Sequence, residues 1–446
     1  MRIVIAGVGN VGFHLAKMLS FEDHAITIID TSAEKLRHAS NYLDVATIKG
    51  SSTSFSVLDD AGVAKADLLI AVTSSEEINI FTSILAKNMG ASKVVARISN
   101  TEYLWKRDRF DLRKLGIDEI ISPESLAAKE IKRLLKETAV TDAFEFDKGV
   151  LNMIGVTIEN HSILHNRPMM DLPDLNPDQN FVTVGLLRNN ETIIPGGKTR
   201  FMAGDHAYFV TQANGVNTIL NLAGKERIAI RDIMIMGGSK VGINAAKSLS
   251  HTYNVKLIEI DPVKCEELAD MLPDVMIING DARNVDLIME EGLENMDAFI
   301  GVTGNSETNI IACLLAKKKG VKKTIALVEN IEYIHISQSI GVDTLINKKL
   351  IAASFIFRYV RRGEIVSLTS IHGVDAEVLE FEVKPNSLIT KRKLRDLDFP
   401  PSAKVGGVMR EGRGYTTLGD FEFMAGDRVV VLTRPECIYK VESFFK

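Results

Sequence analysis

The chain has few cysteines and no excess of basic residues. Its three cysteines, Cys265, Cys313 and Cys437, lie far apart in a chain of 446 residues, without the pair spacing of a zinc, haem or redox site. We therefore expect reduced thiols in a cytosolic protein. The formal net charge of -5 at pH 7 disfavours nucleic acid as a partner, because nucleic-acid-binding domains usually present a basic face.

Long apolar runs and common catalytic motifs are also missing. No apolar stretch approaches the roughly 20 residues that a helix needs to cross a bilayer, and Met1 to Ile3 lead directly into a predicted strand. We expect neither a signal peptide nor insertion into the membrane. Neither a P-loop nor a nucleophile elbow occurs. His161 and His165, four residues apart, fall across a strand end and a loop, which favours an exposed pair over a metal site.

What the chain does contain is an internal repeat. The run Gly7-Val8-Gly9-Asn10-Val11-Gly12 returns, altered, as Gly237-Gly238-Ser239-Lys240-Val241-Gly242. Four further pairs of segments repeat in the same order: 28–30 with 259–261, 49–51 with 279–281, 71–79 with 301–309, and 201–205 with 423–427. Self-similarity of this kind indicates a unit of about half the chain that is duplicated in tandem.

Each copy begins with apolar strands that alternate with helices. In the first copy we predict strands at 2–6, 25–30, 68–72 and 94–98, a strand closing at Ile48, and helices at 11–19 and from Ser122-Pro123 to about Ala139. This alternation is typical of a parallel sheet covered by helices on both faces. From Phe144 the pattern changes to short alternating strands, followed by a polar stretch from Gln212 to Lys225.

The predicted fold class is therefore α/β. We expect two tandem Rossmann-like domains, residues 1–140 and 226–362, each followed by a small α+β domain, residues 141–225 and 363–446. Both Rossmann-like domains open with a glycine-rich loop between the first strand and the first helix, which is where this fold binds phosphate.

The first loop carries a complete G-x-G-x-x-G motif. Gly7 permits the tight turn, Gly9 lets backbone N–H groups approach a pyrophosphate, and Gly12 packs the helix on the strand. The anion would lie at a helix N-terminus, where unpaired N–H groups favour negative charge. Asp30, at the end of the second strand, suits a ribose and repels a 2′-phosphate. The pattern favours NAD(H) or an adenosine nucleotide over NADP(H), with a vestigial fold that binds nothing as the alternative.

The second loop departs from the motif. Ser239 replaces the middle glycine and puts a side chain where a phosphate must come close, although Lys240 offers a positive charge. Asp261 is matched with Asp30 in this comparison of the copies. Nucleotide binding and a purely structural copy both remain open for the second half.

The sequence indicates a sensor rather than an enzyme. A dehydrogenase on this fold needs a substrate domain that supplies a general acid or base near the nicotinamide, and the β-rich modules offer no convincing one. Two alternatives remain at this point: a soluble NAD-dependent oxidoreductase, which would turn over a small substrate, and a scaffold that binds no nucleotide.

The whole chain resembles the regulatory subunits of Trk potassium-uptake systems, of the TrkA type. The resemblance rests on the first glycine loop with Asp30, on Ala71-Val72-Thr73 with Asn79, on Gly280-Asp281-Ala282-Arg283, and on duplication at the right lengths. It implies two RCK N-terminal (KTN) domains, each followed by an RCK C-terminal domain. It also implies a peripheral ring of four chains on the cytoplasmic side of the membrane, beneath a TrkH-type potassium-transport subunit, gated by NAD(H), ATP or ADP.

The resemblance also assigns residue roles. Gly7, Gly9 and Gly12 would hold phosphates, Asp30 the ribose, Thr73 the region near the pyrophosphate, and Arg97 a phosphate. The full set of expected nucleotide-binding residues is Gly7, Val8, Gly9, Asn10, Val11, Gly12, Asp30, Thr73 and Arg97 in the first half, and Gly237, Ser239, Lys240, Gly242, Asp261, Asp281 and Thr303 in the second. Ser51 stands where many members have aspartate, and Asn10 stands where single-unit relatives often have an arginine on the terminal phosphate.

Overall fold

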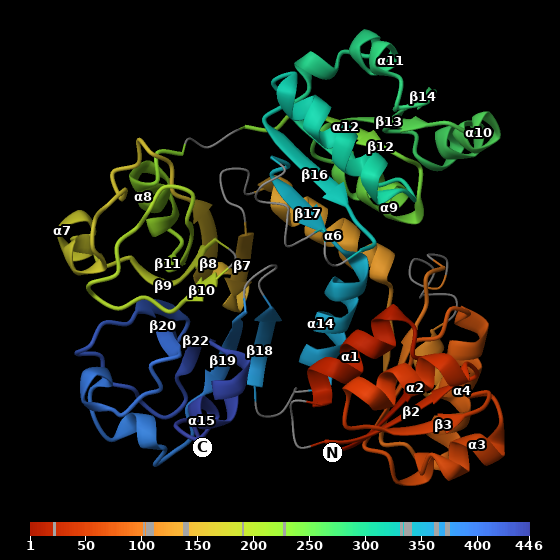
Figure 1. Cartoon of the computed structure of the whole chain (residues 1–446), viewed down its shortest axis with the longest axis horizontal. Helices are drawn as coiled ribbons and strands as arrows, with labels where there is room; N and C mark the ends of the chain where they lie inside the picture. The colour runs from red at the N-terminus through yellow and green to blue at the C-terminus, as the bar shows by residue number, and fades with distance from the viewer. Residues whose placement is uncertain are drawn as a thin grey trace. The chain divides into compact units, whose positions relative to one another are not determined.

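The computed structural model describes residues 1–20, 24–100, 103, 111–136, 142–189, 191–225, 229–330, 333, 341–360, 365–370 and 375–446 (Figure 1). The chain forms two compact units, one of residues 1–129 and 347–360 and the other of residues 130–346 and 361–446. Among the described residues, no helix combines the length and the apolarity that crossing a membrane requires.

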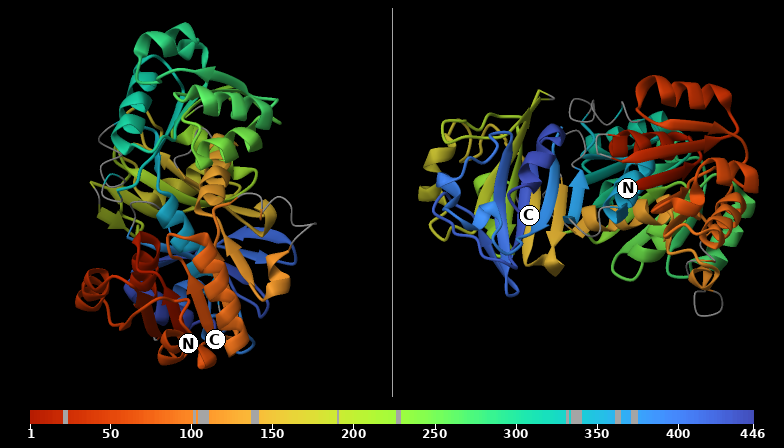
Figure 2. Two further views of the ribbon diagram at one scale, coloured as in Figure 1. Left: turned by 90° about the vertical axis from the view of Figure 1, so that its right-hand side faces the viewer. Right: turned by 90° about the horizontal axis from the view of Figure 1, so that it is seen from below.

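The first unit is built on a six-stranded parallel sheet of order β3-β2-β1-β4-β5-β6. Its elements are β1 (Arg2–Ala6), α1 (Asn10–Ser20), β2 (Ala25–Asp30), α2 (Ala33–Tyr42), β3 (Ala46–Lys49), α3 (Phe55–Asp60), β4 (Leu68–Ala71), α4 (Glu76–Met89), β5 (Lys93–Arg97) and β6 (Glu119–Ile121). Helices cover both faces of the sheet (Figure 2), and β4 is buried along its whole length. This strand order is that of the Rossmann fold, which confirms the predicted fold class.

The second parallel sheet has the equivalent order, β14-β13-β12-β15-β16-β17. Its elements are β12 (Asp232–Met236), α9 (Lys240–Leu249), β13 (Asn254–Glu259), α10 (Pro262–Met271), β14 (Met276–Asn279), α11 (Val285–Glu290), β15 (Ala298–Gly301), α12 (Ser306–Lys318), β16 (Lys323–Leu327) and β17 (Thr344–Ile346). The two Rossmann-like sheets therefore repeat strand for strand, as the duplication predicts.

A long helix follows each of these sheets: α6 (Pro123–Lys136) and α14 (Lys348–Val360). Helix α14 follows the second sheet in the chain but belongs to the first compact unit, where it packs against α1. The boundary between the units falls within α6, and the Nζ of Lys132 donates to the carbonyl oxygen of Ser248 at 2.8 Å. Helix α14 thus lies in the first unit, although the predicted domain boundary at residue 362 assigns it to the second Rossmann-like domain. Apolar periodicity shows that such a helix has a buried face, but not which sheet or helix covers it.

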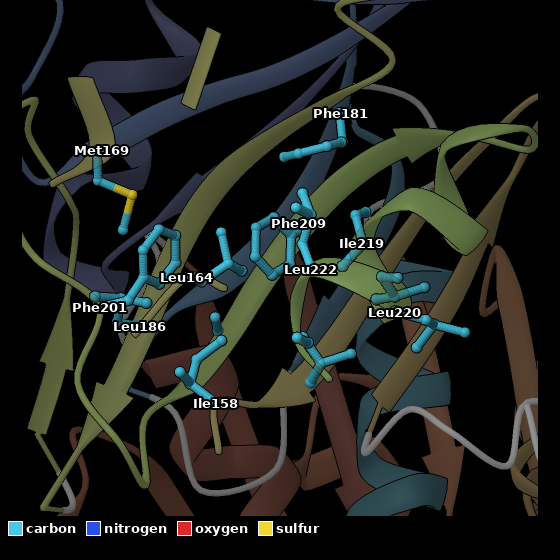
Figure 3. Close-up of a cluster of buried hydrophobic side chains, with 14 residues drawn as sticks. Ile158, Leu164, Met169, Phe181, Leu186, Phe201, Phe209, Ile219, Leu220 and Leu222 are labelled. Atoms are coloured by element: carbon cyan, nitrogen blue, oxygen red, sulfur yellow. The ribbon is translucent and has the colours of Figure 1, made fainter. Parts of the chain in front are cut away.

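The first β-rich module is a five-stranded antiparallel sheet of order β10-β9-β11-β8-β7. Its elements are β7 (Asp142–Phe146), β8 (Leu151–Thr157), α7 (Leu172–Leu175), β9 (Phe181–Arg188), β10 (Glu191–Ile193), β11 (His206–Gln212) and α8 (Gly215–Leu222). The prediction of a polar stretch from Gln212 to Lys225 is wrong, because this segment contains the helix α8, which has buried apolar residues. Ile219 and Leu220 of that helix pack into the module's core with Phe181 and Phe209 (Figure 3).

The second β-rich module has the equivalent order, β18-β19-β22-β20-β21. Its elements are β18 (Ile365–Ser370), β19 (Glu377–Glu382), β20 (Ala403–Arg410), β21 (Arg413–Thr416), β22 (Arg428–Thr433) and α15 (Ile438–Glu442). The two modules share one core within the second unit, in which Val184 and Tyr208 of the first join Val430 and Leu432 of the second. The chain's two β-rich copies are therefore packed as a pair.

The repeated Phe-Met-Ala-Gly-Asp segments make the same turn in both modules. Gly204 and Gly426 have φ of +85° and +89°, a conformation that favours glycine. Asp205, 0% exposed, accepts two hydrogen bonds from Arg188, each 2.7 Å long. Asp427 accepts the same pair from Arg410. Each repeated aspartate therefore anchors its turn to a strand through a buried carboxylate.

The three cysteines take no part in a disulfide within the described residues. Cys265 and Cys313 are buried, and burial raises the pKa of the Cys313 thiol to about 12. The imidazoles of His161 and His165 each face a backbone carbonyl oxygen, that of Gly224 at 3.4 Å and that of Asn160 at 3.1 Å. The contact with Asn160 occupies the Nδ1 of His165, one of the two histidines whose four-residue spacing could suit a metal site.

Candidate functional site

A cleft of about 360 Å³ opens at the carboxyl ends of β1, β2 and β4. β1 lies between β2 and β4, so the strand order reverses here, and this is where ligands bind in open α/β sheets. Seven of the nine residues expected in the first half line this cleft: Gly7, Gly9, Asn10, Val11, Asp30, Thr73 and Arg97. The other two, Val8 and Gly12, belong to the same glycine motif but do not line the cleft.

Each of the three glycines in the first motif has a different structural role. Gly7 has φ of +102°, and a Cβ there would lie 2.8 Å from the backbone nitrogen of Thr73. A Cβ on Gly12 would lie 1.9 Å from the carbonyl oxygen of Gly7, so Gly12 is required for packing of the helix on the strand. A Cβ on Gly9 would meet no atom within 4 Å. The missing side chain of Gly9 therefore keeps the cleft open rather than the fold intact.

Asp30 is held in place by the backbone of two loops. One carboxylate oxygen accepts from the N–H of Val8 and the other from the N–H of Ser32, both at 2.8 Å. A carboxylate has about four lone-pair sites, so these two bonds leave acceptor capacity for further donors. Val8 thus contributes by orienting Asp30 rather than by facing the cleft.

Asn79 explains why the Val-Thr segment and a later asparagine repeat together. Its Oδ1 accepts from both the N–H and the hydroxyl of Thr73, at 2.8 and 2.7 Å, and its Nδ2 donates to the carbonyl oxygen of Arg97 at 2.9 Å. Asn79 is 1% exposed and joins the ends of β4 and β5. Asn309 makes the equivalent bonds to Thr303 in the second half. Both asparagines are positioning residues that the sequence comparison flagged without a role.

Basic side chains gather around the first cleft. Arg97 lines it and lies 3.8 Å from Glu124, and Lys35, Lys348 and Lys349 line it as well. Lys348 and Lys349 were missed by sequence reasoning. They stand more than 330 positions after the glycine loop, and only the packing of α14 on α1 brings them to the cleft.

A second cleft, of about 430 Å³, occupies the equivalent place in the second Rossmann-like domain. Gly237, Ser239, Asp281 and Thr303 line it, whereas Lys240, Gly242 and Asp261 do not. The Ser239 hydroxyl donates to the carbonyl oxygen of Val302 at 2.6 Å and accepts from the N–H of Gly242 at 3.2 Å. In the second loop, therefore, the Ser239 side chain already accepts from one of the N–H groups at the start of α9. Gly9, at the equivalent position of the first loop, has no side chain that could do so.

The matching of Asp261 with Asp30 is wrong. Ala6 of β1 pairs with Ile29, and the equivalent Met236 of β12 pairs with Ile258, so the residue after each partner is Asp30 in one half and Glu259 in the other. The spacing between the first two strands is one residue shorter in the second copy, which shifts the alignment. Ungapped comparison of short segments could not reveal this shift, because both candidates are acidic.

Asp261 caps α10, and its Oδ1 accepts from the N–H of Val263 at 3.0 Å. Glu259 instead lines the cleft and accepts from the N–H of Gly238 at 2.9 Å, as Asp30 does from Val8. Burial raises the pKa of Glu259, but N–H donors and the Lys264 ammonium, 3.1 Å away, more than offset this and lower the pKa below its ordinary value. The second cleft thus retains an ionised acid, on a longer side chain.

Comparisons with known proteins agree with this architecture. The TrkA-N domain family model matches residues 3–123 and 233–348, and the TrkA-C domain model matches residues 153–224 and 378–446. The Trk system potassium uptake protein TrkA of Haemophilus influenzae is 31% identical, over 100% of this chain and 99% of its own. A Trk system potassium uptake protein TrkA homolog of Archaeoglobus fulgidus is 32% identical, over 100% of both chains.

Among solved structures, one described as "GsuK channel bound to NAD" has a TM-score of 0.59 at 14% identity, over 100% of this chain and 78% of that one. At that identity the likeness concerns the fold. The two relatives are named as potassium uptake proteins, in line with a regulator rather than an oxidoreductase. The chain belongs to the TrkA family of Trk potassium uptake proteins.

Proposed function

We propose that this protein is a nucleotide-sensing regulatory subunit at the cytoplasmic face of the cell membrane, where it gates a TrkH-type potassium-transport subunit. The observation that carries the proposal is the first cleft, in which an intact glycine loop, a helix start and Asp30 surround one space. The ligand is an adenine nucleotide: NAD(H), or ATP or ADP as an alternative or additional ligand. The relatives' names supply the potassium uptake system as the setting.

In this proposal the N–H groups at the start of α1 bind phosphate, and Asp30 accepts hydrogen bonds from the ribose hydroxyls. Replacing Asp30 with alanine removes these charge-assisted bonds, which contribute about 1.5–3 kcal/mol. We expect the affinity for nucleotide to fall about 10- to 100-fold in calorimetric titration of the full-length protein. Asp60→Ala, at an exposed site on α3 away from the cleft, is the matched control. Equal affinities in the two variants would exclude Asp30 from the site.

The two clefts should differ in affinity. The first loop offers phosphate an open approach at Gly9, whereas the Ser239 hydroxyl occupies the N–H of Gly242 in the second. We expect one tight nucleotide site per wild-type chain, with the second cleft weak, empty or restricted to a mononucleotide. Ser239→Gly should strengthen the second site, and Gly9→Ser should weaken the first. If neither exchange changes the number or strength of sites measured by calorimetry, the asymmetry does not exist.

Gating requires that the ligand bind two conformations of the assembly with different affinities. The helices that follow the two parallel sheets, α6 and α14, are the segments through which a change at a nucleotide site can reach the rest of the chain. Helix α14 packs in the first unit but follows β17 of the second unit in the chain. If the two halves were expressed separately, the first half would therefore lose the helix that packs against α1. The intact chain is therefore the form to test.

We further propose that four chains assemble into a ring of eight Rossmann-like domains. Phe81 on α4 and Ile311 on α12, each two positions after the buried asparagine of its domain, are 50% and 66% exposed. Large apolar side chains exposed at equivalent sites suit contacts between domains. Phe81→Asp combined with Ile311→Asp should give a smaller particle than wild type in light scattering, whereas the exposed Met170→Asp should not. A wild-type protein that is a strict monomer would overturn the ring.

A further inference from the structure

A third cavity lies between the two β-rich modules, and none of the residues that line it belongs to a glycine loop. Its volume is about 470 Å³, more than that of either nucleotide cleft. Met169 and Phe181, labelled in Figure 3, belong both to the core of the first module and to the wall of this cavity. Cavities of this size at the boundary between two domains are frequent binding sites for small molecules.

The two walls of the cavity come from equivalent strands of the duplicated module. Phe181 begins β9 and Ala403 begins β20, and each strand has one register shift at the same place in its pairing with the neighbouring strand. This register makes Val182 and Lys404 equivalent, and both line the cavity. The second copy therefore carries a lysine where the first carries an apolar side chain.

Lys404 brings a positive charge to a partly buried place. Its Nζ donates to the carbonyl oxygen of Pro195 in the first module at 2.9 Å, and it has no acidic partner among the described residues. Burial lowers the pKa of this ammonium. An ammonium has three N–H donors, so the carbonyl oxygen leaves two of them for further acceptors. A lysine in such a setting is usually paired with an anion.

The rest of the wall is mainly apolar and includes Leu397, Phe399 and Pro400. The Asn176 amide is engaged by the backbone of its own module, and the Thr417 hydroxyl donates to the carbonyl oxygen of Val405 at 2.9 Å.

The charge of the cavity limits the ligands that it suits. Among the described residues that line it, Lys404 is the only charged one, whereas four basic side chains line the first cleft. One unpaired cation offers little to a polyphosphate, but it complements an anion of a single charge. Apolar walls around that cation favour an anion whose body is hydrocarbon.

Hydrogen bonds between the modules hold the cavity in shape. Arg434 donates to the carbonyl oxygen of Thr192 at 2.9 Å, and the N–H of Asp375 donates to the hydroxyl of Thr192 at 2.8 Å. Beside the cavity, the Thr416 hydroxyl donates to the carbonyl oxygen of Gln179. A ligand therefore enters a site that is already formed, which lowers the entropy cost of binding.

From these observations we infer that the cavity between the β-rich modules binds a small organic monocarboxylate. The Lys404 ammonium binds the carboxylate, and the apolar walls contact the hydrocarbon body. The ligand contacts both modules at once, at a site separate from the two nucleotide clefts. The inference does not depend on nucleotide binding.

The test is calorimetric titration of the full-length wild-type protein with butanoate, hexanoate and octanoate, and with octan-1-ol as the uncharged relative of the last. We expect saturable binding of octanoate. Burial of hydrocarbon contributes about 0.8 kcal/mol per CH₂, so the affinity should rise roughly two- to fourfold with each added CH₂. Octan-1-ol should bind about tenfold more weakly, because it makes no charge-assisted contact with Lys404.

Lys404→Met keeps the apolar stem and should lower the affinity for octanoate about tenfold or more. Lys404→Arg keeps the charge and should bind octanoate more tightly than Lys404→Met does. The matched control is Lys440→Met, which removes an exposed lysine of α15 that does not line the cavity, and it should match wild type.

Three results would each overturn the inference. The first is wild-type protein without saturable binding of octanoate. The second is equal affinity for octanoate and octan-1-ol, which needs no variant and so does not depend on how Lys404→Met folds. The third is octanoate binding that is as tight in Lys404→Met as in Lys440→Met.

Discussion

Gly9→Leu should abolish nucleotide binding in the first cleft and leave the fold intact. A side chain at this position enters open space, since a Cβ meets no atom within 4 Å, and that space is where the phosphates must lie. Backbone donors have to come within about 3 Å of phosphate oxygens. Losing two such charge-assisted bonds, at about 1.5–3 kcal/mol each, corresponds to a loss in affinity of at least about 100-fold. Calorimetric titration with nucleotide measures the effect, and circular dichroism checks the fold.

Two other glycines provide matched controls. Gly12→Leu should instead destabilise the domain, because a Cβ there would lie 1.9 Å from the carbonyl oxygen of Gly7. Gly196→Leu, in the first β-rich module, also points into open space and should change neither stability nor binding. If Gly9→Leu binds nucleotide as tightly as wild type, the first glycine loop does not hold phosphate.

Asp205→Ala should lower the free energy of unfolding of the unit that contains it by about 3 kcal/mol, the lower end of the cost of breaking a buried ion pair, because the Arg188 side chain left behind is 31% exposed. The carboxylate is fully buried, accepts two bonds from Arg188, and accepts a third from the N–H of Met202 at 2.8 Å. Without it, the Arg188 guanidinium would keep only its bond to the carbonyl oxygen of Arg200, and the N–H of Met202 would lose the carboxylate that it bonds. Urea denaturation of the full-length protein followed by circular dichroism measures the change.

An exposed pair gives the comparison. Asp420 lies 2.8 Å from Arg395, with both side chains more than half exposed, so Asp420→Ala should cost less than about 1 kcal/mol. A similar small cost for Asp205→Ala would mean that the repeated Phe-Met-Ala-Gly-Asp turn does not depend on its carboxylate. Asp427→Ala in the second module should reproduce the larger effect, since its contacts are the same.

The sequence allowed the main architecture to be predicted because the relevant signals are local. Apolar strands alternating with helices, and a glycine triad between the first strand and the first helix, each depend on residues within a short window. The duplication strengthened the prediction of two equivalent domains, because Thr73 and Asn79 recur at the same spacing as Thr303 and Asn309. The structure then supplied the reason for that spacing in the hydrogen bonds of the two asparagines.

The features that were missed depend on contacts between distant segments. Lys348 and Lys349 reach the first cleft through the packing of α14 on α1, which no local pattern encodes. Residue type does not distinguish Glu259 from Asp261, because strand register decides which of the two acids ends the strand. The sequence around α8 predicts a polar stretch, although Ile219 and Leu220 of this helix pack into the core. Tertiary packing determined each of these outcomes.

The central claim, that this regulator senses an adenine nucleotide, is tested most directly by calorimetric titration of the intact wild-type chain with ATP, ADP, NAD and NADH. The account predicts saturable binding of at least one of these ligands, with about one tight site per chain. Absence of measurable binding for all four ligands, in a protein whose circular dichroism shows it to be folded, would contradict it.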